Sequence, residues 1–207
     1  MQSTRVYKYL GLHIDDQLKF SEHAANIKTK ILPFIAMLRK IRFLIPSALM
    51  LSIYCARIHS HPVHLISIWG FAARQLIEQL QVLQNRTIRT VFWREYTQEN
   101  LPTEEIYKRY GILKLEQLLK YDAVLSIFKM RRGMLRLNIE LTTFSEEHNH
   151  DTRGRGNYLL PLTRTTTAKK SLFNDGLLWY NLLPNALKQL THLVPFKKGL
   201  KKNIGSE

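Results

Sequence analysis

Two adjacent carboxylates near the start of the chain have the type and placement of metal ligands. Asp15 and Asp16 end the short apolar run "YKYLGLHIDD". Enzymes that join nucleotides with two magnesium ions place carboxylates at the end of a strand, because Mg²⁺ prefers oxygen ligands. Such a centre also needs a carboxylate from a second strand, and no Asp-bearing strand precedes this one. We therefore expect Asp15 and Asp16 to end the strand and to start the turn into the first helix.

The histidines are a second group of candidate metal ligands. Zinc accepts three nitrogen ligands and a water molecule, but the His-x-His spacing is only a moderately specific signal. A zinc knuckle is excluded because the chain has one cysteine. We predict no metal site and no cofactor, and expect a surface loop or a phosphate contact for both clusters: His59, His61 and His64, and His148 and His150 with Asp151.

Phosphate binding is the chemistry that the charge of the chain favours. Lys and Arg total 31 against 16 Asp and Glu, which gives a formal net charge of +15. Between Glu22 and Glu78 the sequence has no acidic residue, whereas a surface that only needs solubility usually mixes both signs. We therefore expect a phosphate-bearing partner, with a basic surface that has no ligand as the alternative.

The basic residues suited to this role fall in two groups. The first group lies on two predicted helices, residues 21–43 and 74–93, and the second lies in the polar region that follows the helices. Contacts from such residues to phosphates depend strongly on salt and are largely blind to sequence. The candidates are Lys28, Arg39, Arg42, Arg86 and Arg89 in the first group, and Arg153, Arg155, Lys169 and Lys170 in the second.

Helices are expected to position these residues. One strand is predicted over residues 6–14, and it has no partner of its own for its backbone hydrogen bonds. In the helix over residues 21–43, Pro33 is expected to introduce a kink or a break. The spacing of four and three predicts one apolar face on this helix, formed by Ile27, Ile31, Phe34, Leu38 and Ile41.

The fold class predicted from these patterns is mostly α, a helical bundle with one N-terminal strand and a long irregular loop region. The polar stretch after Gly133 carries Gly, Thr and Pro signals and little periodicity. We predict four segments: residues 1–20 with the strand and turn, 21–135 as a helical domain, 136–170 as a polar loop region, and 171–207 as a helical segment with a basic tail.

The sequence predicts no membrane span and no secretion. The most apolar window, residues 43–56, is shorter than the roughly 20 residues that a bilayer requires. The N-terminal residues lack the apolar core of a signal peptide, and a single cysteine allows no disulfide within the chain. We therefore expect the protein in the nucleus or the cytoplasm.

Several blocks of the sequence resemble, in the same order, the C-terminal part of the reverse transcriptase of non-LTR retrotransposons, the jockey-like and LINE-type elements. "YLGLHIDDQLKFSEH" looks like the segment that closes the palm, and "IHSHPVHLISIWG" looks like a segment of the thumb. "LQVLQNRTIRTVF", "HNHDTRGRGNYL" and "GLLWYNLLP" look like three later blocks of the family. Matching positions include Trp69, Gly70, Gln81, Gln84, Asn85, Arg86, Arg89, Gly176 and Asn181, whereas Tyr180 stands where the family has Trp.

The resemblance implies a truncated or decayed RNA-directed DNA polymerase of a transposable element. Residues 1–20 would be a remnant of the palm, and residues 21–135 would be thumb-like. In the family the catalytic aspartates and their Mg²⁺ lie upstream, so we expect this chain alone to be inactive in primer extension. The expected ligand is the RNA–DNA hybrid of template and primer, or an RNA or DNA backbone, and an upstream palm would be a partner if the chain is part of a longer one.

Two other functions fit the same charge pattern. One is a non-enzymatic nucleic-acid-binding protein used by its host, which would bind in the same way as the polymerase fragment. The other is a helical scaffold whose basic face meets acidic proteins or an anionic membrane surface.

Overall fold

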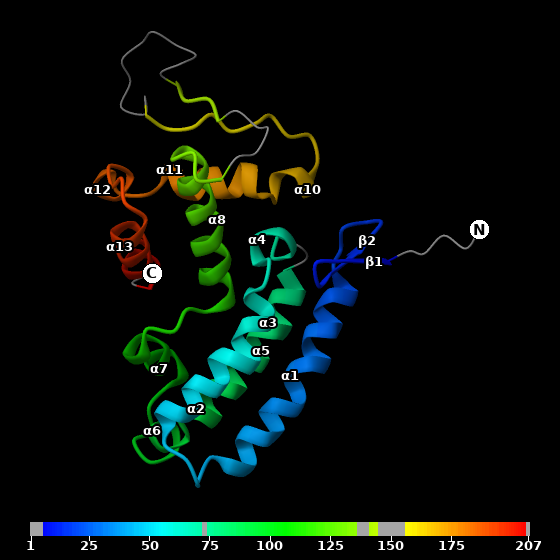
Figure 1. The fold of residues 1–207 in the computed structure, drawn as a ribbon, viewed down its shortest axis with the longest axis vertical. Helices are drawn as coiled ribbons and strands as arrows, with labels where there is room; N and C mark the ends of the chain where they lie inside the picture. Colours follow the sequence, from blue (N-terminus) through cyan, green and yellow to red (C-terminus); the bar gives the residue numbers. More distant parts are fainter. Residues whose placement is uncertain (1–5, 72–73, 136–140, 145–155, 206–207) are drawn as a thin grey trace, which may run out of the picture. The chain divides into compact units, whose positions relative to one another are not determined.

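Helices make up most of the computed structural model, which describes residues 6–71, 74–135, 141–144 and 156–205 (Figure 1). The mostly α fold predicted from the sequence is confirmed, because the sheet has only two strands among these residues. The chain forms two units, Met1–Leu118 and Leu119–Glu207. The division into four segments stays a prediction.

A β-hairpin stands where the sequence predicted one strand. β1 (Val6–Tyr9) pairs antiparallel with β2 (Leu12–Asp15). The turn between them puts Leu10 at φ 47° and Gly11 at φ 85°, and a two-residue hairpin turn of type I′ needs positive φ at both positions. The sequence does not predict this turn, because Leu-Gly lacks the usual Asn-Gly or Asp-Gly signature. The strand therefore has a hydrogen-bonding partner in its own neighbouring residues.

The hairpin leads into the helices of the first unit. Three of them, α1, α2 and α5, lie side by side, and α1 and α2 both contact α5 (Figure 1). A π-helical turn continues α2 directly. The helical elements are α1 (Ser21–Ile41), α2 (Ser47–Tyr54), η1 (Cys55–His59), α3 (Ser60–Val63), α4 (Ile66–Trp69), α5 (Arg74–Val91), α6 (Trp93–Thr97), α7 (Thr103–Tyr110) and the start of α8 (Leu115–Arg131).

Helix α1 runs unbroken through Pro33, so the predicted break is absent. Its buried face is close to the one that the sequence predicts, with Ile35 buried and Phe34 only partly buried. Ile35 lies four residues from Ile31 and three from Leu38, which the 3.6-residue period allows equally well. The predicted face is therefore confirmed, except that Ile35 takes the place of Phe34 at its centre.

His23 on α1 is a histidine buried in the core of the first unit. Its Nδ1 accepts a hydrogen bond from the backbone N–H of His13 at 3.5 Å, and its ring meets the Trp69 ring edge-on at 5.5 Å. Burial lowers the pKa of His23 to about 4, and the neighbouring His13, His64 and Lys30 act in the same direction. The buried imidazole is therefore neutral at physiological pH.

We predict that acid destabilises the first unit through His23. Because its pKa is near 4 in the folded protein and 6.5 in the unfolded chain, the unfolded chain binds the proton more tightly. The free energy of unfolding is therefore fully retained above pH 6.5 and should fall by about 1–3 kcal/mol toward pH 4. Urea unfolding at several pH values measures this slope.

The matched variant is His23→Gln, whose side-chain oxygen can still accept the bond from His13. It should lose most of the pH slope, leaving the part that His61 contributes, since burial lowers the pKa of His61 as well. An unchanged slope in this variant would place the acid sensitivity elsewhere.

Side-chain hydrogen bonds of Asn181 join two segments of the second unit. Its side chain donates to the carbonyl of Tyr158 at 2.8 Å and accepts from the N–H of Tyr158 at 2.9 Å. The rings of Phe128 and Phe196 stack at 3.9 Å. The elements after α8 are α10 (Thr166–Lys169), η2 (Leu172–Gly176), α11 (Leu177–Asn181), α12 (Asn185–Lys188) and α13 (Leu193–Gly205).

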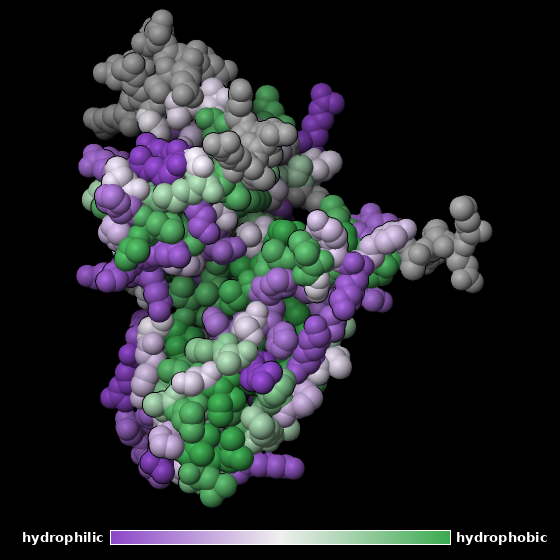
Figure 2. Space-filling model, in the orientation of Figure 1, coloured by the Kyte–Doolittle hydropathy of each residue, from purple (hydrophilic) through white to green (hydrophobic). Residues whose placement is uncertain are grey.

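No helix in the described part of the chain is both long enough and apolar enough to cross a membrane. Apolar side chains are nevertheless exposed where α1 connects to α2, and Figure 2 shows hydrophobic surface there. Phe43, Leu44 and Leu49 are 57%, 80% and 51% exposed. This cluster, called the apolar tip below, lies beside the basic residues at the end of α1.

Candidate nucleic-acid interface

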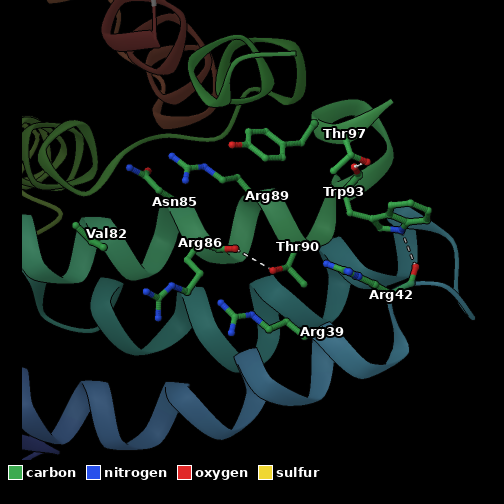
Figure 3. Close-up of a pocket in the computed structure, with 10 residues that line it drawn as sticks. Arg39, Arg42, Val82, Asn85, Arg86, Arg89, Thr90, Trp93 and Thr97 are labelled. Carbon is green, nitrogen blue, oxygen red and sulfur yellow. Dashed lines mark hydrogen bonds between the residues drawn. The ribbon is translucent and has the colours of Figure 1, made fainter. Parts of the chain in front are cut away.

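Four of the predicted arginines line one groove on the first unit. Arg39 and Arg42 come from the end of α1, and Arg86 and Arg89 come from α5 (Figure 3). The groove has a volume of about 540 Å³. Its other lining residues are Val82, Asn85, Thr90, Trp93, Tyr96 and Thr97.

The packing of α1 against α5 brings the two pairs of arginines together. Arg86 and Arg89 are three residues apart, so they lie on the same face of α5, and both are exposed. The neighbouring positions Thr87 and Ile88 are buried and face the core. The end of α1 is fixed nearby, because the indole N–H of Trp93 donates to the carbonyl of Arg42 at 2.8 Å.

The groove is positively charged without a carboxylate to balance it. Among the described residues, the cations that form ion pairs are Arg74, Arg109 and Lys114, and none of these lines the groove. Four guanidinium groups around one concave surface concentrate the positive potential there. Each guanidinium can also bind a phosphate through two parallel hydrogen bonds.

Aromatic rings hold two of the four guanidinium groups in place. Arg42 lies 4.6 Å from the ring centroid of Phe43 and 5.9 Å from that of Trp93. Arg89 lies 5.4 Å from the ring centroid of Tyr96. Such cation–π contacts restrict the side chains but leave most of their N–H groups able to donate. The groove is therefore partly organised before any ligand arrives.

A network of amides fixes the wall of the groove that α5 provides. The side-chain NH₂ of Gln81 donates to the side-chain oxygen of Asn85 at 2.8 Å and to the hydroxyl of Tyr107 at 3.2 Å. The hydroxyl of Tyr107 donates to the same oxygen of Asn85 at 2.9 Å. Gln81 also accepts from the backbone N–H of Leu115 at 2.8 Å. These bonds tie α5 to α7 and to the start of α8.

Lys28, Lys169 and Lys170, the other predicted site residues that the structure describes, do not line the groove. Lys28 on α1 donates to the side chain of Gln79 and does not line the groove. Lys169 and Lys170 are exposed in the second unit. Arg153 and Arg155 lie outside the described residues.

The polar and aromatic half of the groove was not among the predicted site residues. Val82, Arg86, Arg89, Trp93 and Tyr96 are spaced by four, three, four and three, the pattern of a single helical face. Following this face beyond the end of α5 into α6 would have added Trp93 and Tyr96 to the predicted arginines. The charge pattern alone does not identify them.

Asp15 has the structural role that the sequence predicted. Its carboxylate accepts hydrogen bonds from the backbone N–H groups of Gln17 at 3.1 Å, Lys19 at 2.9 Å and Phe20 at 2.6 Å. Partial burial raises the pKa of the Asp15 carboxyl, but these hydrogen bonds outweigh it, and the pKa lies below its ordinary value. The carboxylate thus stabilises the turn between β2 and α1.

Two histidines of the first predicted cluster have structural partners. His64 donates from Nε2 to the carbonyl of Leu10 at 2.9 Å, and His59 shares a hydrogen bond with the hydroxyl of Tyr54 at 3.1 Å. No group of three or more potential metal ligands occurs in the part of the chain that the structure describes. The second predicted cluster, around His148, lies outside that part.

Comparisons of the chain with protein-family models, with curated proteins and with solved structures found no match. The resemblance to retrotransposon reverse transcriptases therefore stays a prediction. What the groove can bind follows from its own geometry and charge.

Proposed function

We propose that the protein binds the phosphate backbone of nucleic acid in the arginine groove of its first unit. The observation that carries this proposal is that Arg39, Arg42, Arg86 and Arg89 surround one groove and form no ion pair with a described carboxylate. A cluster of unbalanced cations on a concave surface favours a polyanion, because each phosphate that it neutralises releases condensed counterions.

The sequence resemblance suggests where such a protein comes from. We propose that the chain derives from the thumb and C-terminal part of a non-LTR retrotransposon reverse transcriptase, and that it acts in the nucleus or the cytoplasm. Template–primer hybrid, RNA and DNA all present the phosphates that the groove fits. A host-used nucleic-acid-binding protein would use the same groove in the same way.

A second candidate function is peripheral binding to an anionic membrane surface. The apolar tip favours it, since Phe43 and Leu44 are exposed beside Arg39, Lys40 and Arg42 at the end of α1. Basic residues flanking exposed aromatic and aliphatic side chains are typical of surfaces that dip into lipid headgroups. The groove therefore favours a phosphate backbone, whereas the apolar tip favours an anionic lipid surface.

A paired binding assay separates the two functions. We expect the protein to bind short RNA, DNA and hybrid oligonucleotides, and we expect the logarithm of the affinity to fall linearly with the logarithm of the salt concentration. The double variant Leu44→Ser/Leu49→Ser should change these affinities by less than about twofold, because both side chains belong to the apolar tip, are exposed and do not line the groove. Fluorescence anisotropy measures them, with co-sedimentation on phosphatidylserine vesicles in parallel. Vesicle binding that this variant abolishes, together with no oligonucleotide binding, would favour the membrane function and exclude the proposed one.

A further inference from the structure

We infer that the groove holds unpaired nucleotides of a single strand, with a base against Tyr96 and the phosphates on Arg86 and Arg89. This inference rests on the proposed function and specifies its ligand. A volume of about 540 Å³ lies within the range of sites that enclose small molecules, which is roughly 300–1,000 Å³. One or two nucleotides fit such a groove, whereas a duplex keeps its bases stacked inside and meets a protein mainly with phosphates and groove edges.

Tyr96 gives the groove a surface for base stacking. The ring is 37% exposed, lines the groove and lies 5.4 Å from the guanidinium of Arg89. Bases of a single strand stack on tyrosine rings and on guanidinium planes alike. Tyr158 and Tyr180 in the other unit are buried and offer no such surface.

Polar side chains in the groove suit the edges of an unpaired base. The side-chain oxygen of Asn85 already accepts from Gln81 and Tyr107, so the NH₂ group of Asn85 is the part with donors for a ligand. The hydroxyls of Thr90 and Thr97 donate to backbone carbonyls, which leaves their oxygens as acceptors. Hydrogen-bonding edges are exposed in a single strand and are paired in a duplex, so these groups favour the single strand.

Binding assays with matched oligonucleotides test this inference. We expect the full chain to bind a short single strand more tightly than a blunt duplex of the same length at the same salt concentration. We also expect a strand with abasic sites at its centre to bind more weakly, although it carries the same phosphates. Fluorescence anisotropy gives the three affinities directly.

Substitution of Tyr96 provides the second part of the test. Tyr96→Ala should weaken single-strand binding by roughly five- to a hundredfold, the effect of losing one stacked base. Tyr96→Phe keeps the ring and should bind like the original protein. Tyr7→Ala is the matched control, because Tyr7 is 66% exposed on β1 and does not line the groove.

The possible outcomes separate this inference from the proposed function. Equal or tighter binding of the duplex, with no loss in Tyr96→Ala, would overturn the single-strand inference. If Arg86→Ala/Arg89→Ala still weakened binding in that case, nucleic-acid binding by the groove would stand. If neither the arginine variant nor Tyr96→Ala changed binding of any oligonucleotide, both proposals would be wrong.

Discussion

Replacing Arg39, Arg86 and Arg89 together by alanine should weaken oligonucleotide binding by roughly two to three orders of magnitude near 0.1 M salt. The estimate follows from counterion release. The logarithm of the affinity falls with the logarithm of the salt concentration, with a slope of about −0.7 per neutralised phosphate on single strands and about −0.9 on duplexes. Three lost contacts should therefore make the slope shallower by about two to three. Arg42 is kept, because its carbonyl and its contacts with Phe43 and Trp93 hold the end of α1 in place.

The control for this experiment removes the same charge from elsewhere on the first unit. Lys8, Lys19 and Lys108 are exposed and do not line the groove, so their triple alanine variant has the same net charge as the arginine variant. The lysine variant should lose less than about tenfold in affinity. At this salt concentration the Debye length is about 10 Å, so charges farther than that from the bound phosphates have little effect. Equal losses in the two variants would show that binding depends on net charge and not on the groove. Both variants should fold normally, because exposed charges rarely contribute more than about 1 kcal/mol to stability.

The sequence predicted the four arginines of the groove but not how they are arranged. The helix predicted over residues 74–93 carries Arg86 and Arg89, and the absence of acidic residues between Glu22 and Glu78 pointed to Arg39 and Arg42. Neither signal shows that two distant segments meet, because that depends on how α1 and α5 pack. Lys28 has the same charge as Arg39 and lies on the same helix, α1, but it does not line the groove.

Gln84 on α5 shows why hydropathy alone does not predict which residues of a helix are buried. Gln84 lies at the centre of the buried face, where an apolar residue would be expected. Its NH₂ group donates to the hydroxyl of Tyr54 at 2.9 Å and to the carbonyl of Leu113 at 3.0 Å. A hydropathy pattern treats Gln84 as exposed, because the partners that make its burial favourable are close only in the folded chain.

Many residues that carry the family resemblance stabilise the fold. Gln81 and Asn85 connect α5 to α7 through the hydroxyl of Tyr107. Asn181 forms hydrogen bonds with both the backbone N–H and the carbonyl of Tyr158. Gly176 is packed so closely that a Cβ atom there would lie 3.1 Å from a methyl carbon of Leu172. These side-chain contacts and this close packing are structural, whereas Arg86 and Arg89 line the groove.

Trp69→Ala should lower the free energy of unfolding of the first unit by about 3–5 kcal/mol, one of the largest effects that a single substitution can have in this protein. Trp69 is 0% exposed, its ring contacts His23 at 5.5 Å, and its indole N–H donates to the carbonyl of His64 at 3.1 Å. The substitution leaves a large cavity and an unpaired carbonyl between α4 and the N-terminal end of α1.

Two further variants show which part of Trp69 matters. Trp69→Phe keeps much of the ring volume but loses the hydrogen bond, so it should cost about 1–2 kcal/mol. Ile68→Ala on the same short helix should cost less than about 0.5 kcal/mol, because Ile68 is 52% exposed. Urea unfolding monitored by circular dichroism gives the three values. Similar small losses for Trp69→Ala and Ile68→Ala would mean that α4 does not anchor the hairpin end of the first unit. Since Trp69 lies away from the groove, any Trp69→Ala protein that remains folded should bind oligonucleotides with nearly unchanged affinity, which separates the stability of the unit from its binding.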